Sequence, residues 1–241
     1  MAQNKVTMDY MAEVILDRVK TGEPFAVARY GDGEYIAAHP LSDMQFSTYD
    51  IHVGYYPNLH ERMNIAQNIL NSIDGLDFIG VTKQGTGTWG QSREYFECYA
   101  KQPIVPLDFH HYFSVKGITT KILETTKKLL YISGHIINFN RFENIETIIH
   151  IDIPLQTCKY PEKRKYYPEY YDRTVKTIRG LDLRGYVCLV GAGFIGKPFM
   201  MELKNRGGIA IDLGSQMDRL AGYVIRGKSG KVATKDNEFK L

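Results

Sequence analysis

The chain has 241 residues with 44% apolar and 24% charged side chains, and its formal net charge is +3. These values are typical of a globular protein with a sizeable core, and a charge this small does not by itself indicate a nucleic-acid-binding protein. Three cysteines without a CxxC pair argue against a disulfide framework or a zinc site, and a charged N-terminal segment without a long apolar run predicts a cytoplasmic chain with no signal peptide or transmembrane segment.

Helices and strands are expected to alternate along the chain. In the first half, apolar spacing predicts helices at 7–21, 58–73, 89–102 and 115–128, and strands at 24–29, 76–82, 103–108 and 129–134. In the second half, it predicts strands at 146–154, 185–193 and 209–214, and helices at 168–179 and 194–208. The alternation predicts one α/β domain over residues 1–241, with a Rossmann-like, mostly parallel sheet flanked by helices and a polar tail at about 227–241.

The first glycine-rich turn, RYGDGE, directly follows the first predicted strand. Ligands of parallel sheets bind where the strands end, so this turn is a candidate site. Gly31 and Gly33 permit a sharp turn. Such a turn would bring the carboxylates of Asp32 and Glu34 together, where a divalent cation such as Mg²⁺ or Mn²⁺ would relieve their repulsion. Arg29 would contact a phosphate group or pair with one of the acids. The alternative is an ordinary turn that leads into a helix, with Glu34 in the first helical turn.

The hexapeptide RYGDGE resembles the R-[FY]-G-D-G-E signature of the GT-D-fold glycosyltransferases, which use nucleotide sugars. The second half is also similar to that family, with a strand, the turn GAGFIGK, a helix and the segment GGIAIDLG, so the resemblance covers at least residues 24–39 and 186–222. It implies a GT-D-type fold in which Asp32 and Glu34 form the site associated with the divalent metal and the sugar-nucleotide diphosphate. The chain departs from the family pattern at Ser215, where that pattern has a histidine after the strand-end glycine.

The second glycine-rich turn, GAGFIG, matches G-x-G-x-x-G at Gly191, Gly193 and Gly196, and Asp212 ends the next predicted strand. This pattern also fits the fingerprint of an NAD(P)-dependent oxidoreductase. Against that alternative, only about thirty residues follow the helix after the motif, and the fingerprint usually opens a longer nucleotide-binding half. A turn at a helix N-terminus favours any diphosphate, and the glycines alternatively serve only for close packing.

We therefore expect a metal-dependent glycosyltransferase whose donor is a nucleoside-diphosphate sugar, with UDP as the expected nucleotide. Lys83 and Lys197, together with the two glycine turns, are further candidate contacts to the phosphates. Asp212 is a candidate for binding the ribose or the base. Asp218 or His135 would deprotonate the hydroxyl group of the acceptor.

The expected acceptor is a glycan or a glycoprotein. The basic, tyrosine-rich segment 159–173 adds a hydroxyl group of modified DNA as a second acceptor class. A non-catalytic nucleotide- or glycan-binding subunit is the remaining alternative, and a homo-oligomer is left open.

Overall fold

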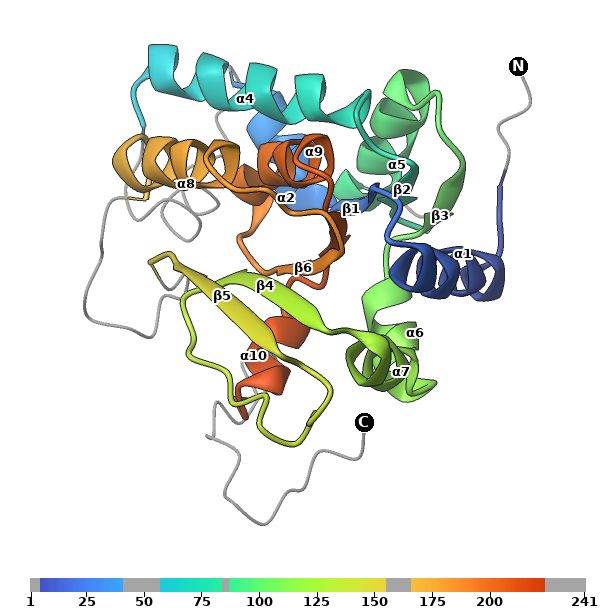
Figure 1. Ribbon diagram of the computed structural model, residues 1–241. Coiled ribbons are helices and arrows are strands. Elements are labelled where there is room, and N and C mark those ends of the chain that lie inside the picture. Colours follow the sequence, from blue (N-terminus) through green and yellow to red (C-terminus); the bar gives the residue numbers. More distant parts are fainter. Residues whose placement is uncertain (1–4, 41–56, 84–86, 155–165, 224–241) are drawn as a thin grey trace.

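The computed structural model describes residues 5–40, 57–83, 87–154 and 166–223, in which helices and strands alternate (Figure 1). The strands are β1 (Phe25–Tyr30), β2 (Phe78–Val81), β3 (Ile104–Pro106), β4 (Lys128–Ser133), β5 (Thr147–Asp152), β6 (Tyr186–Val190) and β7 (Ile209–Asp212). The helices are α1 (Met8–Thr21), α2 (Asp32–Ala38), α4 (Leu59–Ile73), α5 (Thr88–Tyr99), α6 (Phe109–Val115), α7 (Ile118–Thr125), α8 (Glu169–Arg179), the 3₁₀ turn η2 (Phe194–Gly196), α9 (Lys197–Asn205) and α10 (Gln216–Leu220).

The described strands form one sheet in the order β3-β2-β1-β7-β6-β4-β5, and each neighbouring pair is parallel. This arrangement confirms the predicted α/β class with a parallel, Rossmann-like sheet. β1 lies near the centre, between β2 and β7. Because the strands run in the same direction, the carboxyl ends of β1, β7, β6 and β4 lie side by side along one edge of the sheet.

Two layers of helices cover the sheet (Figure 1). Helices α2, α4, α5, α8 and α9 pack on what we call the first face, and α1, α6, α7 and α10 pack on the second face. In β1, Ala28 and Tyr30 belong to the core of the first face, while Phe25 and Val27 belong to the core of the second. The alternation along the strand therefore places Arg29 on the second face. A strand buried on both sides has a continuous apolar sequence, which is why short apolar runs predicted these strands.

The helices have local start and stop signals and one buried side. α1 begins after Thr7, whose side chain accepts a hydrogen bond from the N–H of Tyr10, and it ends at Gly22, which has φ of 74°. Met11 and Ile15 bury its inner side. None of the helices in the described ranges combines the length and the apolar character needed to cross a bilayer.

The segment after β3 differs from the prediction. The sequence predicts one helix at 115–128, but the structure has α6 and α7, separated at Gly117, where φ is 66°. Phe109 and Phe113 bury α6 in the core of the second face.

Two other helices that apolar spacing did not predict are α2, with seven residues, and α10, with five. Helices this short do not complete the periodic pattern from which a helix is predicted.

Candidate functional site

Most of the predicted site residues lie at what we call the carboxyl edge, meaning the ends of β1, β7, β6 and β4 with the residues that follow them. β1 leads into Gly31, β7 ends at Asp212, β6 leads into Gly191, and β4 is followed closely by His135. The sheet order makes these four strands neighbours. The fold thus gathers residues that lie far apart in the sequence.

The RYGDGE segment is the start of helix α2. Gly31 is the N-cap residue with φ of −108°, and neither Gly31 nor Gly33 is among the glycines with positive φ. Asp32 and Glu34 occupy the first and third helical positions, and helical residues two positions apart do not face each other. Asp32 is accordingly exposed, whereas Glu34 turns inward towards Lys197. The expected convergence of the two carboxylates is not found, and the alternative of a helix start describes the segment.

Glu34, Lys197 and Asp212 form what we call the buried ion cluster. Lys197 Nζ lies 2.5 Å from Asp212 Oδ2 and 3.0 Å from Glu34 Oε1. The side chains of Lys197 and Asp212 are both 5% exposed, and that of Glu34 is 13% exposed. The cluster connects the starts of α2 and α9 to the end of β7. The ammonium group of Lys197 therefore pairs with two carboxylates of the protein itself.

Backbone N–H groups complete the buried ion cluster. Glu34 Oε2 accepts a hydrogen bond from the N–H of Gly31 at 2.8 Å. Asp212 Oδ2 also accepts from the N–H of Arg29 at 3.0 Å, and Asp212 Oδ1 accepts from the N–H of Gly214 at 3.1 Å. The carboxylate of Asp212 therefore fixes the backbone of β1 and of the turn after β7. Its contact with a ribose or a base stays a prediction, and in this arrangement its partners are all within the protein.

Opposing effects determine the pKa of Glu34. Burial alone would raise this pKa, but the charge of Lys197, the hydrogen bond from Gly31 and the charge of Arg29 together lower it below the ordinary value of 4.5. Glu34 is therefore ionised at neutral pH, and its pairing with Lys197 is a true ion pair.

Arg29 lies on the second face, across β1 from the buried ion cluster. Its Nε and Nη1 atoms are buried and have no hydrogen-bond partner among the described residues. Gly214, with φ of 48°, makes room for the side chain, because a Cβ atom there would overlap with Nη1 of Arg29. Buried polar atoms are nearly always hydrogen-bonded, and a guanidinium group is well suited to phosphate and carboxylate oxygens. The unsatisfied guanidinium group is thus a candidate anion-binding site.

His135 and Asp218, expected as alternative bases, are bonded to each other. His135 Nε2 donates to Asp218 Oδ1 at 3.1 Å. The side chain of His135 is 4% exposed and the ring of Tyr223 stacks on it, with centroids 4.6 Å apart, whereas Asp218 is 23% exposed. Asp218 is therefore the more accessible member of the pair, and its carboxylate is hydrogen-bonded to the buried ring of His135.

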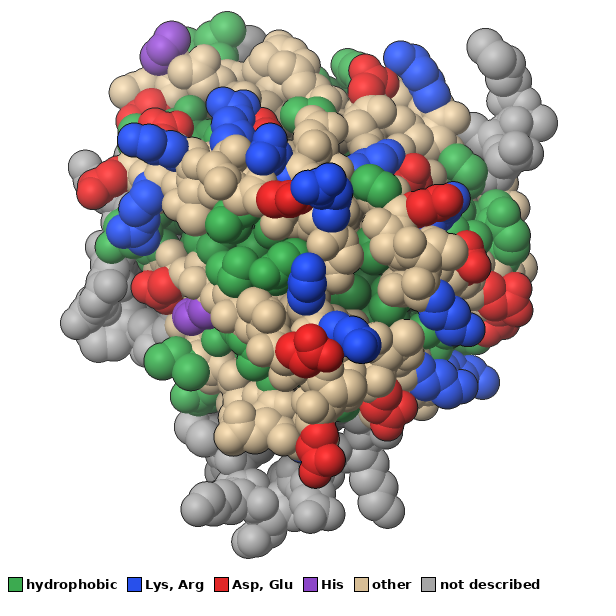
Figure 2. All heavy atoms as spheres, in the orientation of Figure 1, with side chains coloured by type: hydrophobic (Ala, Val, Ile, Leu, Met, Phe, Trp, Pro, Cys, Tyr) green, Lys and Arg blue, Asp and Glu red, His purple; other side chains and the backbone are tan. Residues whose placement is uncertain are grey.

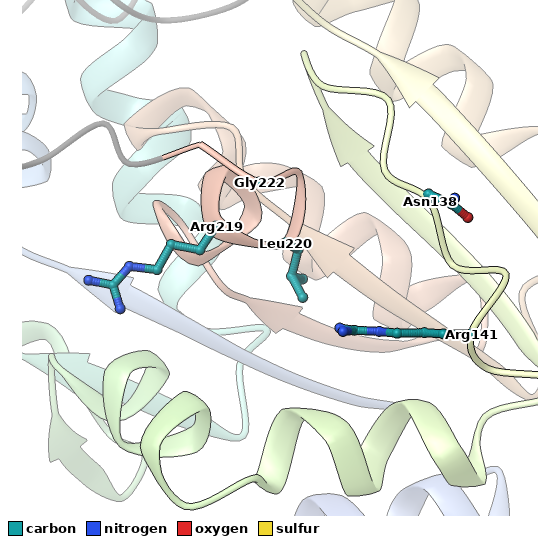
Figure 3. Close-up of a pocket in the computed structure, with 5 residues that line it drawn as sticks. All are labelled: Asn138, Arg141, Arg219, Leu220 and Gly222. Carbon is teal, nitrogen blue, oxygen red and sulfur yellow. The ribbon is translucent and has the colours of Figure 1, made fainter. Parts of the chain in front are cut away.

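A pocket of about 220 Å³ lies at the end of α10, the helix that carries Asp218. It is lined by Asn138, Arg141, Arg219, Leu220 and Gly222. Figure 3 shows that Arg141 points towards Leu220 of α10, whereas Arg219 points away from it. The pocket lies between α10 and the segment after β4, which are the two parts of the chain joined by the bond between His135 and Asp218.

The glycines of GAGFIG permit close packing at the carboxyl edge. A Cβ atom on Gly191 would lie 2.6 Å from Met217 Cγ in α10, and a Cβ atom on Gly196 would lie 2.6 Å from the Cβ of Ala192. Gly193 has φ of 57°, a conformation that side chains disfavour. These observations fit the packing alternative. Contact between this turn and a diphosphate stays a prediction.

Two further polar side chains lie beside the site. Lys83 follows β2, its side chain is 72% exposed, and its Nζ pairs with Asp108 Oδ2 at 3.0 Å. Gln216, which no sequence pattern indicated, is 3% exposed and donates from Nε2 to His111 Nδ1 at 2.8 Å. Its Oε1 atom is buried and has no hydrogen-bond partner in the described part of the chain. Gln216 belongs to no recognisable sequence motif, because its place beside the site depends on how α10 packs.

The residues present do not form a two-carboxylate clamp for a metal ion in this arrangement. Both oxygen atoms of Glu34 are bonded within the protein, and Asp32 lies on a different side of α2. Across the described ranges, no group of three or more His, Cys, Asp or Glu side chains could hold a metal ion together. Asp32 is exposed, and its contact with a divalent ion that is bound mainly through phosphate oxygens stays a prediction.

No protein-family model and no curated protein matches the chain. Among solved structures, a protein described as a new glycosyltransferase (DUF1792) from Streptococcus sanguinis superposes with a TM-score of 0.59 and 14% identity, over 92% of this chain and 83% of that one. A structure described as showing that the domain of unknown function 1792 has a distinct glycosyltransferase fold gives a TM-score of 0.56 with 16% identity, over 91% of this chain and 79% of that one. The chain therefore has a fold similar to that of glycosyltransferase-fold proteins.

Proposed function

We propose that the chain is a glycosyltransferase that moves a sugar from a nucleoside-diphosphate sugar to a hydroxyl group. The observation that carries the proposal is the guanidinium group of Arg29, whose Nε and Nη1 atoms are buried at the carboxyl edge without a hydrogen-bond partner among the described residues. Ligands of parallel α/β folds bind at this edge. The similarity to glycosyltransferase-fold structures supports the same assignment.

The proposed role of Arg29 is to bind the diphosphate of the donor. As the bond between the sugar and the diphosphate breaks, negative charge increases on the departing phosphate oxygen. A fixed, partly buried cation at that position stabilises the transition state more than it stabilises the ground state. The backbone N–H of Arg29 is held by Asp212, so the guanidinium group extends from a fixed point.

The proposed base is Asp218. Its carboxylate would take the proton of the acceptor hydroxyl while the hydroxyl oxygen bonds to the anomeric carbon and the nucleoside diphosphate leaves with the electrons of the old bond. His135 donates to Asp218 Oδ1 and is itself buried under Tyr223, so it is a positioning residue. The pocket beside α10 offers space for part of the acceptor.

A divalent ion, expected as Mg²⁺ or Mn²⁺, would neutralise charge on the diphosphate when bound. In this arrangement Asp32 is exposed and Glu34 is paired with Lys197, so the proposed roles of Arg29 and Asp218 do not depend on the ion. UDP remains the expected nucleotide.

The proposed acceptor is a glycan or a glycoprotein. Residues 159–165 of the segment that suggested a DNA acceptor lie outside the described residues, and in the part that follows, the rings of Tyr166 and Tyr167 are buried. On the face of the molecule in Figure 2, basic and acidic side chains are interspersed, which does not favour the phosphate backbone of DNA.

The test is release of nucleoside diphosphate from UDP-, GDP- and CDP-sugars, with Mn²⁺ and with EDTA, by wild type and Arg29→Met. We expect turnover of at least one donor and a large loss in the variant. A thermal-shift panel separates the alternatives, because stabilisation by NAD(P) alone would favour an oxidoreductase and tight donor binding without any turnover would favour a non-catalytic subunit. Full activity of Arg29→Met would contradict the proposed site.

A further inference from the structure

The ammonium group of Lys197 lies between two buried carboxylates, a position in which a metal ion is often found. Two carboxylates in a buried place repel each other unless a positive charge lies between them. Here the charge between Glu34 and Asp212 is an ammonium group, at 3.0 Å and 2.5 Å from their oxygen atoms. The pair that needs neutralising is thus Glu34 with Asp212, and it excludes the exposed Asp32.

The hydrogen bonds of the buried ion cluster leave Glu34 no oxygen atom without a partner. Oε1 is paired with Lys197, and Oε2 accepts the N–H of Gly31 at 2.8 Å. Lys197 also pairs with Asp212 Oδ2 at 2.5 Å, and its charge lowers the pKa of Glu34. A divalent ion at Glu34 would have to displace Lys197 and leave a buried ammonium group partly unpaired, which is costly.

We propose that Lys197 is the permanent counter-charge of Glu34 and Asp212 in place of a divalent ion, and that Glu34 is a positioning residue. Asp212 bonds to the N–H groups of Arg29 and Gly214, which are the residue and the glycine that shape the candidate anion site. The cluster therefore fixes the backbone from which the Arg29 guanidinium group extends. Only this last consequence rests on the proposed function; the identity of the counter-charge does not.

The test measures Mn²⁺ binding to nucleotide-free protein by electron paramagnetic resonance of unbound Mn²⁺. We expect no saturable binding to wild type in the micromolar range. Lys197→Met leaves the two acids without their cation, so Mn²⁺ should bind at least about tenfold tighter than to wild type. The double variant Lys197→Met with Glu34→Gln should lose this gain. Lys101→Met, which removes a lysine whose side chain is 79% exposed, is the matched control and should leave binding unchanged.

Two results overturn the proposal: micromolar Mn²⁺ binding by wild type that Asp32→Asn and Glu34→Gln each abolish, or no gain in folded Lys197→Met. A second measurement covers the case in which Lys197→Met does not fold. Glu34→Gln should lower the melting temperature by the same amount in EDTA as in Mn²⁺, because its partner is Lys197 in both. A loss confined to the Mn²⁺ samples would identify Glu34 as a metal ligand. None of these measurements uses a sugar nucleotide, so their outcome is separate from that of the proposed transferase activity.

Discussion

On the first face of the sheet, the strand ends carry charges that are paired inside the protein. On the second face they carry the guanidinium group of Arg29, two of whose buried nitrogen atoms have no hydrogen-bond partner among the described residues. Lys197 on the first face has two carboxylate partners. Arg29 on the second face has Gly214 against it, a residue with no side chain to offer. Both cations lie at the carboxyl edge, yet within the described part of the chain only Lys197 has a full set of partners.

The difference separates stability from ligand binding at one edge. A buried charge with a full set of partners contributes to the native structure, and removing one partner is costly. A buried donor without a partner costs stability, and this cost is recovered when a ligand supplies the missing acceptor. The comparison therefore predicts opposite responses when the two cations are replaced by methionine, which keeps a long apolar side chain.

The largest expected effect is on the stability of Lys197→Met. The variant leaves Glu34 and Asp212 as buried carboxylates without their shared cation, so the free energy of unfolding should fall by about 3–5 kcal/mol. Urea unfolding followed by circular dichroism measures the loss. Lys101→Met is the control, because that lysine is exposed and its ion pair with Asp74 is worth less than about 1 kcal/mol. Equal losses in the two variants would mean that the buried ion cluster does not contribute as described.

Arg29→Met should show the reverse pattern. Turnover or binding of the sugar nucleotide should fall about 10²- to 10³-fold, the usual effect of removing one group that stabilises a developing oxyanion. The free energy of unfolding should stay the same or rise by about 1 kcal/mol, since two unsatisfied donors are removed. Arg179→Met is the control, because Arg179 pairs with Glu202 and its side chain is 64% exposed. A strong destabilisation of Arg29→Met without a functional loss would break the comparison.

Glu34→Gln tests how the charge of the buried ion cluster contributes to stability at different pH values. At pH 7 the variant should lose about 1.5–3 kcal/mol of stability, the worth of hydrogen bonds to a charged group. The pKa of Glu34 is lowered in the folded protein below 4.5. The stabilisation is therefore complete above that value and is lost as the pH falls through the folded-state pKa. Urea unfolding of both proteins should give a constant difference from pH 6 to 8 and a smaller one at about pH 3.5; a difference that grows in acid would contradict this account.

The smallest expected effect is that of Gly191→Ala. The added Cβ atom would meet Met217 Cγ at 2.6 Å and Gly214 O at 3.0 Å, so α10 has to move. Overpacking of this kind costs about 1–3 kcal/mol, and the shift of Asp218 should lower kcat more than it raises KM. Gly180→Ala is the control, because its added Cβ atom would make only ordinary contacts at 3.5 Å or more. An unchanged kcat in Gly191→Ala would mean that the position of α10 does not matter for turnover.

The sequence predicted the sheet well because its strands are buried on both faces and appear as short apolar runs. It did not predict α6 as a separate helix, because two histidines interrupt its apolar pattern, or α10, which has five residues. For the site, the sequence indicated individual residues, whose roles stay predictions, but not their partners. His135 and Asp218 are 83 positions apart, and Glu34 with Lys197 likewise depends on tertiary packing. The helical start at Asp32, which sends the two acids in different directions, was visible only as an alternative.

The pairing of β1 with β7 has a consequence for how the protein is made. The hydrogen bond from Arg29 to Asp212 spans 183 positions. During synthesis at the ribosome, one edge of β1 therefore stays unpaired until β7, the last described strand, has emerged. Contacts of such long sequence separation slow folding and expose apolar strand edges. Ribosome-bound chains that stop before residue 205 should therefore remain protease-sensitive around residues 25–34, and protection there should appear together with β7.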